Sequence, residues 1–164
     1  MKLKSFFKKL AGNSVEYLGD DKYKVKYSNG DVYEGQMEKA FLNGFGVYTF
    51  SDGDIYAGEF LGGNRHGHGK YFYKDGTVFE GEYKYNLMNG FGRTVFTDGS
   101  VFEGEFLSGK RSGKGKYSYP NGNVYEGYYE NDQRNGKGIF YYKDGRKISC
   151  FFENDRLIRR EEIK

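Results

Sequence analysis

The sequence is poor in several residue types that often indicate the structural class of a protein. In 164 residues, cysteine and proline each occur once and tryptophan is absent. A single cysteine, Cys150, excludes an internal disulfide framework and is typical of a reducing compartment. No apolar run approaches the roughly 20 residues of a membrane-spanning helix, and the opening MKLKSFFKKL lacks the uninterrupted apolar segment of a secretory signal. We therefore expect a cytoplasmic protein.

Hydrophobic residues are also scarce, at 37%, but aromatic residues and glycine are not. The chain contains 17 tyrosines, 15 phenylalanines and 26 glycines. Disordered chains share the low hydropathy but are poor in aromatic residues, so this composition indicates a folded β protein built from glycine and aromatic side chains. Its length predicts one domain.

Charge of one sign is concentrated only at the start of the chain. The formal net charge is +3, and the first ten residues contain four lysines and no acid, so the rest of the chain is close to neutral. A near-neutral body lacks the basic face that a nucleic-acid-binding protein presents, and we predict no nucleic-acid partner.

A repeat of 23 residues organises the chain. Gly-x-Gly pairs and Asn-Gly or Asp-Gly dipeptides recur at this interval, as do triplets of an aromatic residue, any residue and glycine. We predict that the triplet glycines have a structural role: Gly35, Gly58, Gly81, Gly104 and Gly127.

The two histidines, His66 and His68, stand at variable positions beside glycines that the repeat requires. Metal sites usually need three or four ligands, and no cysteine or carboxylate cluster stands at matching spacing. We therefore predict no metal site.

The sequence also predicts no enzyme and no cofactor. The glutamates at the centre of the triplets recur because the repeat recurs, and identical solvated positions do not make an acid and base pair. Cys150 has no histidine near it in the sequence and occupies a core column of the repeat.

The pattern within each repeat predicts a β-hairpin. In the copy from Asp54 to Gly76, alternation predicts strands over 54–60 and 67–73 with a loop over 61–66 between them. We predict that Asp52-Gly53 belongs to a three-residue turn with Gly53 left-handed, because only this register places the aromatic residues of adjacent strands on one face.

The predicted register aligns the rings in one row across the strands, broken at Thr94, beside a row of glycines. We predict a trough whose inner aromatic face is core at its floor and binds a protein partner at its rim. Apolar residues in the early and middle repeats, such as Phe41, Phe45, Tyr85, Leu87, Met88 and Phe91, favour a partner there. The candidate trough residues are Tyr33, Tyr48, Tyr56, Tyr71, Phe79, Phe102, Tyr117 and Tyr125.

From Tyr23 to about Phe152 the sequence resembles the MORN (membrane occupation and recognition nexus) repeat family. The resemblance lies in three motifs of each repeat: Tyr/Phe-x-Gly-x-aromatic, Gly-x-Gly-x-aromatic-x-aromatic and Asp/Asn-Gly. The resemblance implies an all-β fold, an elongated antiparallel β-hairpin array that forms a curved, twisted single sheet, with short terminal caps for which a helix is one option. It implies a scaffold or adaptor that binds protein partners, or phospholipid membranes. The closing FFENDRLIRREEIK is similar to that of retinophilin-type short MORN proteins, which are adaptors for a myosin tail.

We divide the chain into a basic amphipathic segment or cap at 1–20, the repeat array at 21–152 and a charged C-terminal cap at 153–164. The main function expected is a protein-binding adaptor. The alternative is a membrane-associated protein that binds anionic phospholipid through its N-terminal segment. The same segment can instead cap the first sheet edge. Its candidate membrane-binding residues are Lys2, Lys4, Phe6, Phe7, Lys8 and Lys9.

Overall fold

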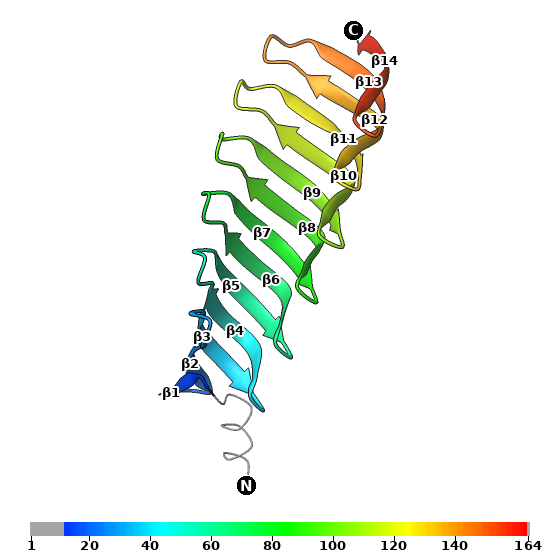
Figure 1. Cartoon of the computed structure of the whole chain (residues 1–164). Coiled ribbons are helices and arrows are strands. Elements are labelled where there is room, and N and C mark those ends of the chain that lie inside the picture. Colours follow the sequence, from blue (N-terminus) through cyan, green and yellow to red (C-terminus); the bar gives the residue numbers. More distant parts are fainter. Residues whose placement is uncertain (1–11, 164) are drawn as a thin grey trace. The chain divides into compact units, whose positions relative to one another are not determined.

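The computed structural model describes residues 12–163, and every regular element among them is a β-strand (Figure 1). The 14 strands are antiparallel and follow one another across the sheet in chain order. This is the all-β hairpin array expected from the sequence. The strands are β1 (Ser14–Gly19), β2 (Lys22–Lys26), β3 (Val32–Glu38), β4 (Phe41–Thr49), β5 (Ile55–Leu61), β6 (Asn64–Phe72), β7 (Val78–Lys84), β8 (Leu87–Val95), β9 (Val101–Leu107), β10 (Lys110–Ser118), β11 (Val124–Glu130), β12 (Gln133–Tyr141), β13 (Lys147–Glu153) and β14 (Arg156–Ile163).

Two compact units divide the strands, where length alone predicted one domain. The first unit takes the chain up to Gly76 with Glu82–Asn86, and the second takes Thr77–Gly81 with the chain from Leu87 onward. Contacts in a repeat array are made between nearest neighbours, which allows the described strands to separate into more than one compact unit.

The Asp-Gly turn is a three-residue hairpin loop, as predicted. Gly53 is left-handed, with φ +105°, and its N–H donates to the carbonyl of Phe50 at 3.1 Å. The N–H of Phe50 donates to the carbonyl of Asp54 at 2.9 Å, which closes the loop. Tyr48 therefore pairs with Tyr56, and the predicted register is confirmed.

The second connection in each repeat is shorter than predicted. The six-residue loop expected over 61–66 is wrong, because β5 continues to Leu61 and β6 begins at Asn64. Gly62 and Gly63 alone form the turn, with φ of +58° and +91°, as in a type I′ hairpin. A bulge shifts the register between Gly58 and Phe60. This bulge breaks the alternation, which is why the segment resembled a loop in the sequence.

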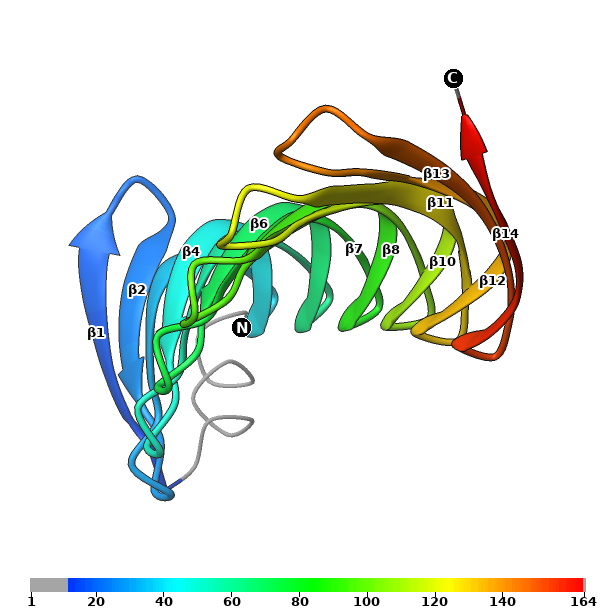
Figure 2. The same ribbon diagram turned by 90° about the horizontal axis from the view of Figure 1, so that it is seen from above.

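Bulges of the same kind shift the register between β9 and β10 and between β11 and β12 in the second unit. A bulge bends the strand that contains it, and Figure 2 shows β10 and β12 bent along their length.

The described ends of the chain are strands and not helices. β14 pairs with β13 and continues the sheet to Ile163, so the segment predicted as a charged C-terminal cap from 153 onward forms a strand of the sheet. At the other end, β1 pairs with β2, so the sheet also begins before residue 21.

Side chains tie each Asp-Gly turn to the next repeat. The Asp31 carboxylate accepts hydrogen bonds from the Tyr48 hydroxyl and the Ser51 N–H, both at 2.8 Å. Asp54 repeats the arrangement with the Tyr71 hydroxyl at 2.7 Å and the Lys74 N–H at 2.8 Å. Each turn therefore stabilises the position of its neighbour.

These bonds predict a loss of stability in acid. Burial alone raises the pKa of Asp31, but the hydrogen bonds from Ser51, Tyr48 and Asn29 outweigh it and hold that pKa below its ordinary value. A lowered pKa in the folded state adds stability above the unfolded-state pKa of about 3.9, and this stability is lost as the pH falls through the folded-state value. We expect the urea midpoint to fall between pH 6 and pH 3, and to fall less in Asp31→Asn. An equal fall in both proteins would contradict this role for Asp31.

Candidate partner-binding surface

The first aromatic residue of each hairpin lies over a pair of glycines. A Cβ added to Gly58 would lie 2.5 Å from the Cα of Gly69 and 2.6 Å from the hydroxyl of Tyr56. In the second unit, a Cβ added to Gly104 would lie 2.6 Å from the Cα of Gly115. The glycines predicted as structural therefore leave the space that the rings fill. The same environment surrounds Gly35, Gly81 and Gly127.

Burial assigns most of the aromatic row to the core. Six of the eight candidate trough residues have at most 8% of their surface exposed, namely Tyr33, Tyr56, Tyr71, Phe79, Phe102 and Tyr125. Tyr48 and Tyr117 are half-buried. A buried ring has little surface to offer a partner, so these six rings act first as core, and partner binding along this row stays a prediction.

Edge-to-face contacts fill the space between consecutive repeats. The ring of Phe102 meets Phe106 at a centroid distance of 5.4 Å and Tyr129 at 5.1 Å, both close to perpendicular. Phe106 also meets Phe79 at 5.1 Å. Such pairs add about 0.5–1.5 kcal/mol each beyond the burial of their area. The face therefore holds the repeats together.

Buried tyrosine hydroxyls on this face stay protonated near neutral pH. Burial raises the pKa of Tyr56 and of Tyr125 to about 12, although a nearby arginine opposes the rise in each case. The Tyr56 hydroxyl donates a hydrogen bond to the carbonyl of Glu59 at 3.0 Å. These groups are suited to fixing ring positions and not to proton transfer near pH 7.

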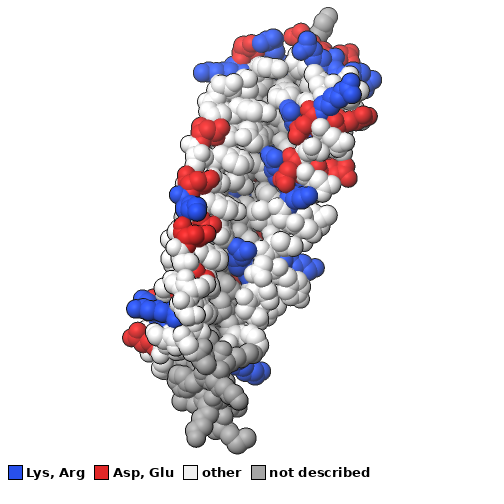
Figure 3. Space-filling view, in the orientation of Figure 1, with Lys and Arg blue, Asp and Glu red and all other residues white. Residues whose placement is uncertain are grey.

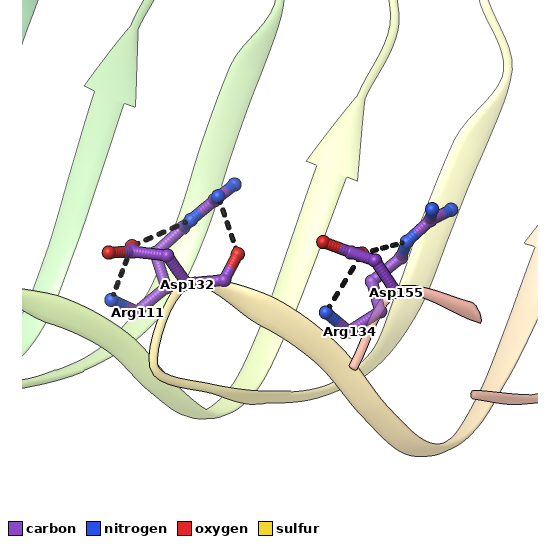
Figure 4. A network of polar contacts seen from close by, with 4 residues as sticks. All are labelled: Arg111, Asp132, Arg134 and Asp155. Atoms are coloured by element: carbon purple, nitrogen blue, oxygen red, sulfur yellow. Dashed lines mark hydrogen bonds and ion pairs between the residues drawn. The ribbon is translucent and has the colours of Figure 1, made fainter. Parts of the chain in front are cut away.

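An arginine column that the sequence analysis missed joins neighbouring hairpins (Figure 4). The side-chain Nε of Arg111 donates to Asp132 at 3.2 Å, and that of Arg134 donates to Asp155 at 2.8 Å. The Arg134 guanidinium also lies 4.2 Å from the ring centroid of Phe152. The signal was available, because Arg65, Arg111 and Arg134 are spaced by 23 and by 46 residues.

A second aromatic column lies at the Asp-Gly and Asn-Gly turns. Its side chains are half-buried and contact the first row, as where Phe140 meets Tyr142 at a centroid distance of 6.1 Å. This column is the more accessible part of the aromatic face. Its members are Tyr27, Phe50, Tyr73, Phe96, Tyr119 and Tyr142.

The open surface of the second unit lies on the opposite face of its strands. A groove of about 750 Å³ crosses this face, lined by the residues that flank the glycines in each strand and not by the aromatic row. Phe91 and Tyr128 line it and are 59% and 46% exposed. The structure thus offers a groove, but it is not the aromatic trough that the sequence predicted.

Acidic and basic side chains alternate along this groove. Lys116 pairs with Glu126 at 3.9 Å inside it, and Glu103, which lines it, pairs with Arg93 at 3.3 Å. These four groups are all substantially exposed, so each pair contributes at most about 1 kcal/mol. Figure 3 likewise shows blue and red side chains interspersed on the face that it presents.

The other apolar residues that the sequence analysis favoured as contacts are mostly exposed. Phe45 and Tyr85 belong to the first unit and are 58% and 60% exposed. In the same unit Phe41 is 41% exposed, and in the second unit Leu87 is 48% exposed while Met88 is half-buried. They lie on strands or in a two-residue turn, and not in long loops.

Neither histidine belongs to a cluster of metal ligands. His66 meets the ring of Tyr85 at 5.3 Å, and His68 is exposed. In residues 12–163, no group of three or more His, Cys, Asp or Glu side chains is placed to hold a metal ion. The same residues contain no helix long and apolar enough to cross a membrane. The candidate membrane-binding residues Lys2, Lys4, Phe6, Phe7, Lys8 and Lys9 lie outside the described part of the chain.

The family model for the MORN repeat matches five consecutive segments, 33–55, 56–78, 79–101, 102–124 and 125–145. The chain belongs to the MORN repeat family. The match ends at residue 145 and gives no support to a retinophilin-like closing segment. No curated protein matches the sequence.

Two solved structures from Drosophila melanogaster share the fold of this MORN repeat chain. One is the TCP domain of SAS-4 (dCPAP) in complex with a proline-rich motif of Ana2 (dSTIL), with a TM-score of 0.56 and 16% identity over 82% of this chain and 75% of that one. The other is the TCP10c domain of Sas-4, with a TM-score of 0.50 and 14% identity over 93% of this chain and 98% of that one.

Proposed function

We propose that this MORN repeat protein is a non-enzymatic scaffold that binds a protein partner. The observation that carries the proposal is the groove of the second unit, where Phe91 and Tyr128 expose large aromatic surfaces while the rings of the opposite face are packed as core. Exposed aromatic surface beside a groove marks an interaction site in a soluble protein.

Two further observations support a binding role. The solved SAS-4 domain that shares the fold was obtained with a proline-rich motif of another protein. The repeat also places equivalent side chains at regular intervals on one face, which suits an extended partner that contacts several repeats.

Affinity purification from the native cell tests this function. We expect the full-length chain and a chain beginning at Gly12 to retain the same partner, because the groove lies in the second unit. Loss of all partners from both chains would reject the scaffold. Loss from the shortened chain alone would move recognition to the N-terminal segment.

The alternative function is peripheral binding to anionic phospholipid through that basic N-terminal segment. Its support is the amphipathic pattern of MKLKSFFKKL alone. Sedimentation with phosphatidylserine vesicles distinguishes the two functions. The alternative predicts binding that the chain beginning at Gly12 loses and that falls as salt is raised.

A further inference from the structure

One row of the groove face interleaves aromatic and basic side chains. In the second unit, Lys114 pairs across the strands with Tyr128. Lys137 pairs with Phe151, which in turn pairs with Arg159. We name these five residues the basic–aromatic row. They line the groove and the smaller pocket beside it, with a base on each of β10, β12 and β14 and a ring on each of β11 and β13.

The basic members of this row are exposed, and within residues 12–163 they form no ion pair with a carboxylate. They are Lys114, Lys137 and Arg159. The neighbouring row differs, because its charges pair with one another across the strands, as in Lys116 with Glu126. The row therefore complements negative charge on a partner.

Two carboxylates lie near the row, but in the described part of the chain neither forms an ion pair with its bases. The Glu105 carboxylate is folded against the bulge, where it occupies the space that a Cβ on Gly113 would need. Glu59 occupies the equivalent position in the first unit, where its carboxylate accepts a hydrogen bond from the N–H of His68 at 2.8 Å. Glu161 lines only the smaller pocket at the end of the row.

The spacing of the bases is closest to the repeat of one partner conformation. Gly115, Gly127 and Gly138 pair in direct register, which places Lys137 two strands from Lys114. Arg159 is two strands from Lys137 because both pair with Phe151, so consecutive bases are about 9.6 Å apart. A polyproline II helix places every third residue on the same side at intervals of about 9.3 Å. A β-strand repeats a face every two residues, about 6.7 Å, and an α-helix returns to a face after seven residues at about 10.5 Å.

We propose that the basic–aromatic row binds an acidic, proline-rich protein segment in the polyproline II conformation, with a carboxylate at every third residue. The carboxylates meet Lys114, Lys137 and Arg159, and the intervening prolines pack on Tyr128 and Phe151. Aromatic grooves suit this conformation because it is formed before binding and loses little entropy. The inference rests on the proposed scaffold function and names its partner class and site.

Fluorescence polarisation with the full-length protein tests the inference. The probe is a peptide of repeated Pro-Pro-Glu, about twelve residues long, to cover the row and one turn beyond it. A peptide of equal composition with all its glutamates in one block is the spacing control. The variant is Lys114→Glu with Lys137→Glu, and the matched control is Lys110→Glu with Lys143→Glu, two exposed lysines of the same unit outside the row.

We expect the row variant to bind the spaced peptide at least about tenfold more weakly than the wild type, and the matched control to bind within about threefold. The spaced peptide is expected to bind better than the block peptide. Equal losses in both variants, or equal binding of both peptides, would overturn the proposal.

The other outcomes separate this inference from the scaffold function. If the row variant still retains the native partner as the wild type does, the scaffold stands and the row is not its site. If neither protein retains any partner, the scaffold itself fails. If phosphatidylserine vesicles bind the wild type but not the row variant, and the peptide binds neither, a membrane is the occupant and the peptide proposal is overturned.

Discussion

Alanine at Gly104 is expected to destabilise the second unit by about 2 to 4 kcal/mol, a large share of the 5–15 kcal/mol typical of a domain. The added Cβ would lie 2.6 Å from both the Cα of Gly115 and the carbonyl oxygen of Lys114, and 2.8 Å from the ring of Phe102. Two of these three contacts are with backbone, which cannot move without separating β9 from β10.

The direction of the stability change at Gly104 is informative, because two opposing effects of alanine can be compared. Gly104 does not have a positive φ, so alanine suffers no backbone strain there. Without the clash, alanine would stabilise the protein by about 0.4–1 kcal/mol, because it lowers the conformational entropy of the unfolded chain. The adjacent change Glu103→Ala is the control, since it removes only an exposed ion pair with Arg93. Urea melts that show Gly104→Ala to be as stable as the wild type would show that the glycine row is not a packing requirement.

The sequence predicted the hairpins, the register and the glycine row because the repeat displays each of them several times. Ring and glycine stand in the same columns in every interior copy, so one register explained all copies at once. A departure in the last hairpin is also explained. Cys150 replaces a glycine in the hairpin where Ile148 replaces the ring. Its partner within that hairpin is Arg160 and not a second glycine, while Gly138 pairs with it from the preceding hairpin.

Which face of the sheet is open was harder to predict, for a physical reason. Rings on a single curved layer looked exposed in the sequence, but most rings of the first row are covered by rings of their own and the next hairpin, as Phe102 is by Phe106 and Tyr129. Burial of this kind comes from packing between repeats and not from the pattern within one. The columns of the opposite face mix charged and aromatic residues from copy to copy, so no repeated pattern marked a groove there. The sequence favoured Phe91 as a partner contact, and Phe91 lines the groove, but its position was not assigned to this face.

The two-residue turns were missed for a related reason. These turns place two successive residues at positive φ, such as Asn131 with Asp132 or Asn154 with Asp155. Asn and Asp tolerate this conformation, but no fixed Asn-Gly pair marks the turn in the sequence. The bulge that follows each turn then shifts the alternation and hides the start of the next strand.

A partner is expected to form a photo-crosslink from position 128 and not from position 142. Tyr128 lies on the groove face and is 46% exposed, whereas Tyr142 is half-buried and contacts Phe140 on the aromatic face. Both belong to the second unit, and both are tyrosines, so p-benzoylphenylalanine replaces a similar side chain in each. A bound segment in the groove places its atoms against one side chain only, because the sheet separates the two faces.

This crosslinking experiment in the native cell, with the full-length protein, tests most directly the claim that the aromatic face holds the fold together while the opposite face binds the partner. The account predicts an adduct of higher mass from position 128, reduced by Lys114→Glu with Lys137→Glu, and none from position 142. An adduct from position 142 with none from position 128 would contradict it and return the binding site to the aromatic face.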